Sequence, residues 1–193
     1  ERQLGKVLRK AATTIAGGDA PGAEEGHDPD LTIGVDDLRP ALGRARFPRD
    51  DHDRRHGPGV ATGLAVTGAG GDVLSVEATA LDGDTGLKVT GQLGDVMSES
   101  AEIAFTYVQA NRESLGVPDG ADQRRFHLHV PAGAVPKDGP SAGVTMTTAL
   151  VSLLTGRPVR PEVGMTGEVT LQGRVLPIGG VKQKVLAAQR AGL

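Results

Sequence analysis

Strand-like and helix-like patterns follow one another from Val60 onward, and this mixture constrains the fold more than any other feature of the sequence. Residues 59–81 predict two strands joined by a glycine-rich turn. The second alternates as a half-buried strand does, at Leu74, Val76, Ala78 and Ala80. Further strands are expected over 87–91 and 125–130, and a hairpin over 166–180 that turns near Gly173.

Three helices are expected in the same part of the chain, over 94–116, 141–158 and 181–192. The first has an apolar stripe at Val96, Met97, Ala101, Ala104, Phe105 and Val108, and Gly116 is expected to end it. Because these strands and helices mix without regular βαβ units, we predict an α+β fold.

The N-terminal quarter has a different residue pattern and composition. Residues 1–16 repeat apolar side chains at helical spacing, and 17–30 are rich in glycine, proline and acid, which is typical of a mobile loop. A short strand and a short helix are expected within 31–47, and the charged residues 48–59 are interpreted as a linker. The chain begins in mid-helix without Met, so we interpret it as a piece of a longer protein.

Composition excludes several functions. Aromatic residues make up 2% of the chain and the net charge is -3, which argues against a base-stacking or phosphate-binding nucleic-acid site. Without cysteine there is neither a disulfide nor a thiolate zinc site. No segment approaches the roughly 20 apolar residues of a membrane span, so we expect no membrane partner.

A serine stands between glycines in Gly139-Pro140-Ser141-Ala142-Gly143, which matches the G-x-S-x-G pattern of a nucleophile elbow. Enzymes with that elbow carry their histidine base after the serine. Here all five histidines precede Ser141, so the α/β-hydrolase arrangement is not expected. A serine hydroxyl still needs a base, which leaves an upstream histidine or a lysine.

Only Lys182 and Lys184 follow Ser141 among the lysines. At about 100° per residue on the last helix, Lys184 shares its side with small and apolar residues, at Gly180, Val181, Ala187, Ala188 and Ala191. Lys182 lies nearer the polar side. Burial would lower the pKa of Lys184 and suit it to act as a base. The alternative is that Lys184 only extends along an apolar face.

Ser141 begins an apolar helix, where free N–H groups favour a developing anion. Since proline has no N–H, the candidates for an oxyanion hole are the amides of Ser141, Gly139 and Asp138. The alternative is that Ser141 is a helix cap. Asp138 is expected to cap the same turn or to orient a nearby group.

His127 and His129 suggest a different chemistry. An H-x-H pair on a strand places both rings on one face, where they could hold zinc in a metal hydrolase. No third ligand is evident from the sequence, and such pairs on a polar strand face are more often structural. We therefore expect no metal.

Three blocks in the second half, "PKDGPSAG", "MTGEVTLQGRVLPIGG" and "GVKQKVLAAQRAG", carry a resemblance to the proteolytic domain of Lon, the ATP-dependent protease. The resemblance covers about residues 59–193, and residues 1–57 resemble the tail of the small helical subdomain of Lon's AAA+ module. It implies a Lon proteolytic domain-like fold (ribosomal protein S5 domain 2-like) with an N-terminal helical segment. The implied domains are 1–47 for the subdomain tail, 48–59 for the linker and 60–193 for a C-terminally incomplete proteolytic domain.

The resemblance implies a catalytic dyad in which Ser141 is the nucleophile and Lys184 the base, while Thr166 helps to position that lysine. Four further residues match polar residues that line the Lon site: His127, His129, Asp138 and Glu168. No G-x-x-x-x-G-K-[ST] motif occurs, so no cofactor is expected in this segment. ATP and Mg are expected for the ATPase module of the full-length protein.

The implied activity is that of an ATP-dependent serine endopeptidase that degrades unfolded, damaged and short-lived regulatory proteins through an acyl-enzyme. The family further implies a homohexameric ring in the full-length protein and a cytoplasmic location. The alternative is a non-catalytic interaction or assembly module with the same fold.

Overall fold

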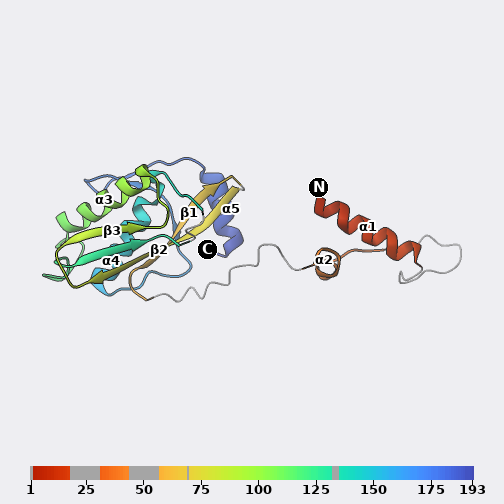
Figure 1. Ribbon diagram of the computed structural model, residues 1–193, viewed down its shortest axis with the longest axis horizontal. Coiled ribbons are helices and arrows are strands. Elements are labelled where there is room, and N and C mark those ends of the chain that lie inside the picture. The colour runs from red at the N-terminus through yellow and green to blue at the C-terminus, as the bar shows by residue number, and fades with distance from the viewer. Residues whose placement is uncertain (1, 18–30, 44–56, 69, 132–134) are drawn as a thin grey trace. The chain divides into compact units, whose positions relative to one another are not determined.

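The computed structural model describes residues 2–17, 31–43, 57–68, 70–131 and 135–193. The chain divides into two compact units, Glu1–Asp50 and Asp51–Leu193 (Figure 1). Most of the predicted mobile loop, 17–30, and most of the predicted linker, 48–59, lie outside the described residues. The assignment of residues 1–47 to a helical subdomain stays a prediction.

The described residues of the first unit form the helices α1 (Arg2–Ala16) and α2 (Val35–Leu42), so the predicted helix over 1–16 is confirmed. The strand expected before α2 is wrong, since residues 31–34 form no strand. Gly34 instead caps α2, and its N–H donates to Asp37 Oδ2 at 2.8 Å, which directs the chain into a helical turn.

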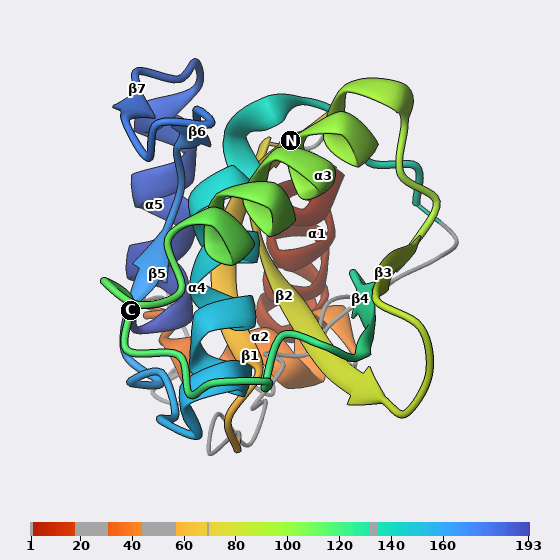
Figure 2. The same ribbon diagram turned by 90° about the vertical axis from the view of Figure 1, so that its left-hand side faces the viewer.

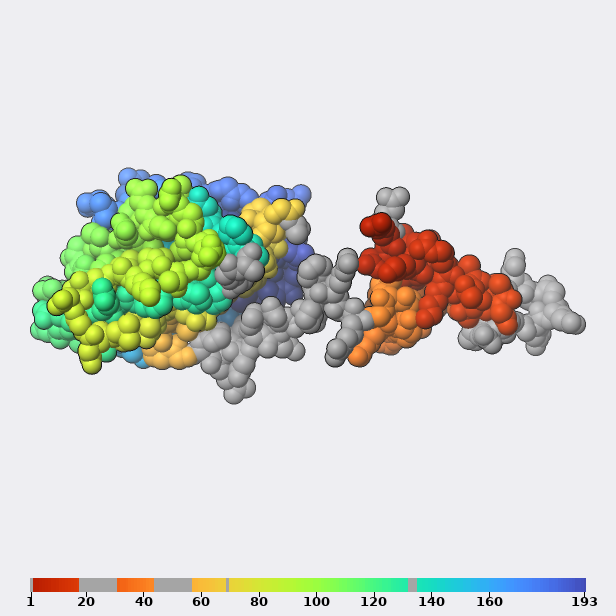
Figure 3. Space-filling model, in the orientation of Figure 1, coloured from red at the N-terminus to blue at the C-terminus, as the bar shows by residue number. Residues whose placement is uncertain are grey.

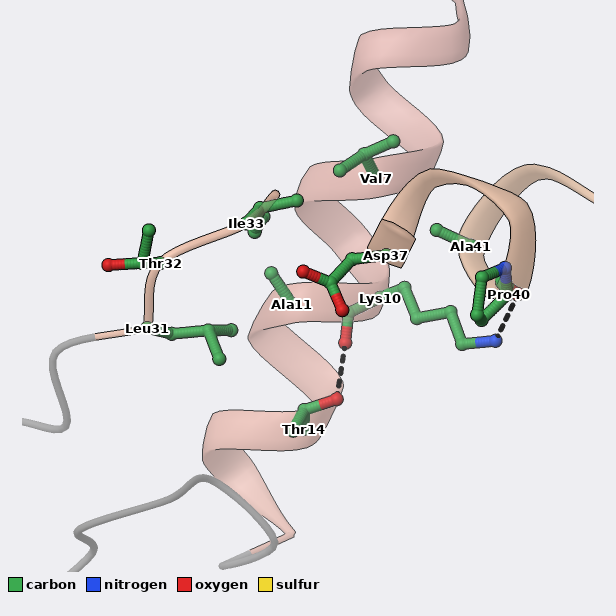
Figure 4. A pocket seen from close by; sticks show the side chains of 10 residues that line it. All are labelled: Val7, Lys10, Ala11, Thr14, Leu31, Thr32, Ile33, Asp37, Pro40 and Ala41. Carbon is green, nitrogen blue, oxygen red and sulfur yellow. Dashed lines mark hydrogen bonds between the residues drawn. The ribbon is translucent and has the colours of Figure 1, made fainter. Parts of the chain in front are cut away.

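A hollow with a volume of about 330 Å³ lies between α1 and the segment that leads into α2 (Figure 4). Lys10 extends beside it and donates from Nζ to the Pro40 carbonyl at 2.7 Å. The side chains that line it are largely apolar: Val7, Ala11, Leu31, Ile33, Pro40 and Ala41, with Lys10, Thr14, Thr32 and Asp37. Among the described helices of either unit, none is long and apolar enough to cross a membrane.

The second unit is built on a five-stranded mixed sheet with the order β3-β4-β2-β1-β5. Its strands are β1 (Val60–Thr67), β2 (Gly70–Leu81), β3 (Gly86–Thr90), β4 (Arg125–His129) and β5 (Gly164–Met165). The central pairs β1–β2 and β2–β4 are antiparallel, whereas β3–β4 and β1–β5 are parallel. The predicted hairpin is confirmed as β6 (Glu168–Val169) and β7 (Val175–Leu176), a separate two-stranded sheet.

Three α-helices pack around this sheet: α3 (Asp95–Ala110), α4 (Gly143–Thr155) and α5 (Val181–Ala191). Because parallel neighbours need a crossover, α3 connects β3 to β4 as one βαβ unit. The other described strands do not repeat this unit in regular order, and the predicted α+β class is confirmed. In the space-filling view, residues of α3 and β3 form much of the visible face of this unit (Figure 3).

The first of these helices ends earlier than predicted. It stops at Ala110, and residues 111–116 form turns up to Gly116, which has φ 71°. Asn111 explains the difference, because both its backbone N–H and its side-chain amide donate to the Tyr107 carbonyl, at 3.1 and 2.9 Å.

The two faces of the sheet carry different helices (Figure 2). A Cβ on Gly63 of β1 would lie 3.1 Å from Thr145 Oγ1, so this face packs against α4. A Cβ on Gly71 of β2 would meet the Gln183 carbonyl and Ala187, so the opposite face packs against α5. Side chains alternate between faces along a strand, so the sheet separates α4 from α5.

The core lies between the sheet and the pair α3 and α4. Phe126, Leu128 and Val130 point into it with no exposed surface, as their alternation predicted. Phe126 packs against Phe105 with ring centroids 5.4 Å apart. Most other core side chains are small or aliphatic, which fits a chain so poor in aromatic residues.

Replacing Leu128 by Ala should lower the free energy of unfolding by about 2–5 kcal/mol, because the side chain is fully enclosed and would leave a cavity. Urea unfolding followed by circular dichroism measures the change. Leu171→Ala is the matched control, since Leu171 is 54% exposed and its loss should change stability by no more than about 0.5 kcal/mol. Equal losses in both variants would contradict this description of the core.

Candidate active site

Ser141 lies in the short 3₁₀ turn η1 (Pro140–Ala142), directly before α4. Gly139 precedes the turn with φ 111°, a conformation that favours glycine. Neither η1 nor α4 has a side-chain cap, so the structure does not support the alternative that Ser141 is a helix cap. Its hydroxyl makes no hydrogen bond to any residue that the structure describes.

The carbonyl of Ser141 is held from the segment after β5. It accepts the Gly167 N–H at 2.8 Å and the Thr166 hydroxyl at 3.2 Å. Gly167 returns a second bond, since its carbonyl accepts the Val144 N–H at 3.0 Å. These contacts fix the serine turn against residues that follow the edge strand β5.

Lys184 lies in the first turn of α5 and is 4% exposed, whereas Lys182 is exposed. The prediction that Lys184 is the buried lysine is confirmed. Its ammonium donates from Nζ to Thr166 Oγ1 at 3.0 Å. Burial lowers the pKa of Lys184 from its ordinary value of 10.5, because the charged form loses water.

Thr166 therefore connects the lysine to the serine turn. Its hydroxyl accepts a hydrogen bond from Lys184 and donates one to the Ser141 carbonyl. Lys184 Nζ and Ser141 Oγ do not form a direct hydrogen bond in this structure. A lysine with a lowered pKa thus lies one threonine side chain away from the turn that holds a free serine hydroxyl.

Asp138 caps a different helix from the one that the sequence suggested. Its Oδ1 accepts the Met97 N–H at 2.9 Å, in the first turn of α3, and the Gly139 N–H at 2.8 Å. A Cβ on Gly94 would lie 2.4 Å from the Asp138 carboxyl carbon, so glycine leaves room for this cap. The Gly139 amide is thereby occupied, whereas the amides of Ser141 and Asp138 have no acceptor among the described residues.

His127 and His129 lie two residues apart on β4. They pair with Thr79 and Glu77 across β2, on the sheet face opposite Phe126 and Leu128. Both rings share the Thr90 hydroxyl, with Oγ1 at 2.8 Å from His127 Nε2 and 2.7 Å from His129 Nδ1. Neither histidine forms a hydrogen bond to Ser141, Thr166 or Lys184, so their role in the site stays a prediction.

Glu168 follows Thr166 by two residues and is partly buried on β6. Its carboxylate makes no hydrogen bond to the part of the chain that the structure describes, and its role likewise stays a prediction. Across the described ranges, no group of three His, Cys, Asp or Glu side chains is placed to hold a metal ion.

The sequence analysis did not identify two residues that hold the turn of Ser141. Gly167 donates its N–H to Ser141, and a turn glycine carries no local signal of such a contact. Ser100 is buried on α3 and donates from Oγ to the Pro140 carbonyl at 3.3 Å. Its position among Met97, Ala101 and Ala104, on the apolar stripe, was the available signal.

Comparison with known proteins shows the family to which the chain belongs. A family model described as "Lon protease (S16) C-terminal proteolytic domain" matches residues 32–193. By class, the second unit is therefore the proteolytic domain of a serine peptidase. The chain belongs to the Lon protease family.

Curated relatives match along the whole chain. It is 64% identical over 193 residues to the Lon protease of Mycolicibacterium smegmatis and 60% identical over 194 residues to that of Salinispora arenicola. It is 53% identical over 194 residues to Lon protease 1 of Bacillus subtilis. In each case the chain spans 24% of the relative's length.

The lowered pKa of Lys184 makes stability depend on pH. Between the folded-state pKa and 10.5, the unfolded chain binds more protons at this lysine, so folded-state stability rises with pH through that window. Lys184→Met removes the titrating group. The free energy of unfolding of this variant should therefore exceed that of the unsubstituted chain by most near pH 7. This excess should fall as pH approaches 10.5.

Urea unfolding at a series of pH values between neutrality and 10.5 measures this difference. Lys182→Met is the matched control, because Lys182 is exposed on the same helix. This variant controls for the loss of a positive charge and of a long side chain from α5. Parallel pH curves for the Lys184→Met variant and the unsubstituted chain would mean that Lys184 is not desolvated in solution.

Proposed function

We propose that this chain carries the peptidase centre of an ATP-dependent Lon endopeptidase, with Ser141 as nucleophile and Lys184 as general base. The observation that supports this most is the hydrogen bond from the buried Lys184 to Thr166, whose hydroxyl also reaches the Ser141 carbonyl. Burial favours the neutral amine, the form that can accept a proton.

The proposed reaction is acyl transfer in two halves. Neutral Lys184 accepts the hydroxyl proton of Ser141 while Oγ attacks the peptide carbonyl, and the Ser141 N–H stabilises the resulting oxyanion. Lys184 then returns the proton to the leaving amine. A water molecule next gives a proton to Lys184 and attacks the ester, and Ser141 regains its proton as the acid product leaves.

The proposed cycle requires a direct hydrogen bond between Lys184 Nζ and Ser141 Oγ, which replaces or joins the bond to Thr166. Thr166 therefore has a positioning role, because it holds the Lys184 amino group beside the serine turn before substrate arrives. His127, His129, Asp138 and Glu168 remain supporting residues in this proposal. Asp138 would act through the α3 cap, which holds the segment just before Ser141.

The remaining functional assignments belong to the whole protein. Relatives named Lon protease are about four times longer than this chain, which fits a separate module that binds ATP and Mg. We further propose unfolded, damaged and regulatory proteins as substrates, a homohexameric ring and a cytoplasmic location. Residues 1–47 would then be the tail of the AAA+ small helical subdomain, with 48–59 as the linker.

Substitution of either dyad residue tests the mechanism. The chain would replace the matching region of the full-length Mycolicibacterium smegmatis relative, and cleavage of an unfolded protein would be measured with ATP and Mg. Ser141→Ala and Lys184→Ala should each lower the rate by about 10³-fold or more, because each removes a group that takes part in bond making or proton transfer. Labelling by a serine-reactive phosphonate should be lost in Ser141→Ala.

Lys182→Ala is the matched control, because this exposed lysine precedes Lys184 by two residues on α5, and it should retain full activity. A chelator added to a peptide assay without ATP or Mg should leave the rate unchanged, which separates the serine mechanism from a metal hydrolase at His127 and His129. Full activity in Ser141→Ala would refute the proposal. Labelling at neither Ser141 nor any other serine would favour a non-catalytic module.

A further inference from the structure

Ser100 is a hydroxyl buried in an apolar helix face. It is 4% exposed and lies on the side of α3 that carries Met97, Ala101 and Ala104, all of them buried. Its Oγ donates to the Pro140 carbonyl at 3.3 Å. A Cβ on Gly143 would lie only 3.0 Å from this oxygen, so Ser100 packs directly against the turn that contains Ser141.

The peptide bond between Pro140 and Ser141 explains why this contact matters. A peptide unit is planar and trans, so its C=O and N–H point in opposite directions. The Pro140 carbonyl accepts both the Ser100 hydroxyl and the Gly143 N–H. Fixing this oxygen therefore fixes the direction of the Ser141 N–H, which has no acceptor among the described residues.

The next peptide is held in the same way from the other side. The Ser141 carbonyl accepts the Gly167 N–H and the Thr166 hydroxyl. The peptides on both sides of the nucleophile are thus fixed through their carbonyl oxygens. Ser100 is the side chain that fixes the Pro140–Ser141 peptide, and the N–H of this peptide would face an oxyanion.

The surroundings of Ser100 argue against a purely packing role. Ala101 and Ala104 lie fully buried on the same helix, so alanine suits this surface. A buried hydroxyl without a partner destabilises a protein by about 1–3 kcal/mol, so serine is favourable here only because the Pro140 carbonyl accepts its proton.

We propose that Ser100 is a positioning residue for the peptidase reaction, which orients the Ser141 N–H toward the oxyanion of the tetrahedral intermediate. The inference rests on the proposed function of Ser141. Ser100 would stabilise the transition state rather than the bound substrate, because the oxyanion forms only after Ser141 Oγ has attacked. Binding of the uncleaved peptide does not use this N–H and should not depend on Ser100.

The inference is tested with Ser100→Ala in the full-length Mycolicibacterium smegmatis relative that carries this chain in place of its own matching region. Its cleavage of a fluorogenic peptide is followed kinetically. The value of kcat should fall about tenfold, less than the loss of a whole oxyanion donor, while KM stays within about twofold. A peptide boronic acid supplies the second readout. Ser141 Oγ bonds to the boron and the hydroxyl proton passes to Lys184, so a tetrahedral adduct forms without a leaving group. The Ser100→Ala variant should bind this boronic acid about tenfold more weakly than the unsubstituted protein does.

Ser98→Ala is the matched control, because Ser98 lies one half-turn earlier on α3 and its hydroxyl has no hydrogen-bond partner among the described residues. It should change neither kcat nor boronate affinity. Ser100→Cys retains a weak donor of similar size and should recover part of the lost kcat. Thermal unfolding of every variant identifies any loss that comes from destabilisation.

Unchanged kcat and boronate affinity in Ser100→Ala would overturn the inference, as would a rise in KM alone or equal effects in Ser98→Ala. If Ser100→Ala does not fold, the comparison of Ser100→Cys with Ser98→Ala decides. A Ser100→Cys variant that folds with normal kcat and boronate affinity would then count against a positioning role. Retained activity in Ser141→Ala would instead refute the proposed function itself.

Discussion

The hydrogen bond between the Lys184 ammonium and the Thr166 hydroxyl is the constraint on which the site depends. A buried cation is unfavourable unless it is partnered, so α5 must bring Lys184 to an acceptor as it packs on the sheet. The same threonine donates to the Ser141 carbonyl. One side chain therefore satisfies the lysine and locates it beside the serine turn.

The sheet explains why that threonine lies just beyond the edge strand. Helix α4 packs on one face and α5 on the other, so residues at their starts are separated by the strands. Thr166 follows β5, the last strand in the order, where a side chain can reach toward both faces. The hairpin of β6 and β7 then carries the chain across to α5.

Local patterns anticipated much of this molecule. Alternation placed Phe126 and Leu128 in the core, and helical spacing identified Lys184 rather than Lys182 as the buried lysine. Local reasoning failed where a partner was distant in sequence. Asp138 caps α3 through Met97, and the Thr90 hydroxyl that His127 and His129 share lies 37 and 39 residues earlier in the chain. No spacing rule predicts such contacts, because the fold alone decides which segments meet.

The sequence by itself determined the α+β class, the core faces of the strands and the burial of Lys184 rather than Lys182. These depend on periodicity and on residue type, which are properties of the chain read locally. Only the tertiary structure decided how Ser141 is held. The Pro140 and Ser141 carbonyls are fixed by Ser100 from α3 and by Thr166 and Gly167 from the segment after β5. The physical reason is that a hydrogen bond depends on distance and direction in space, and these arise only when separate elements pack together.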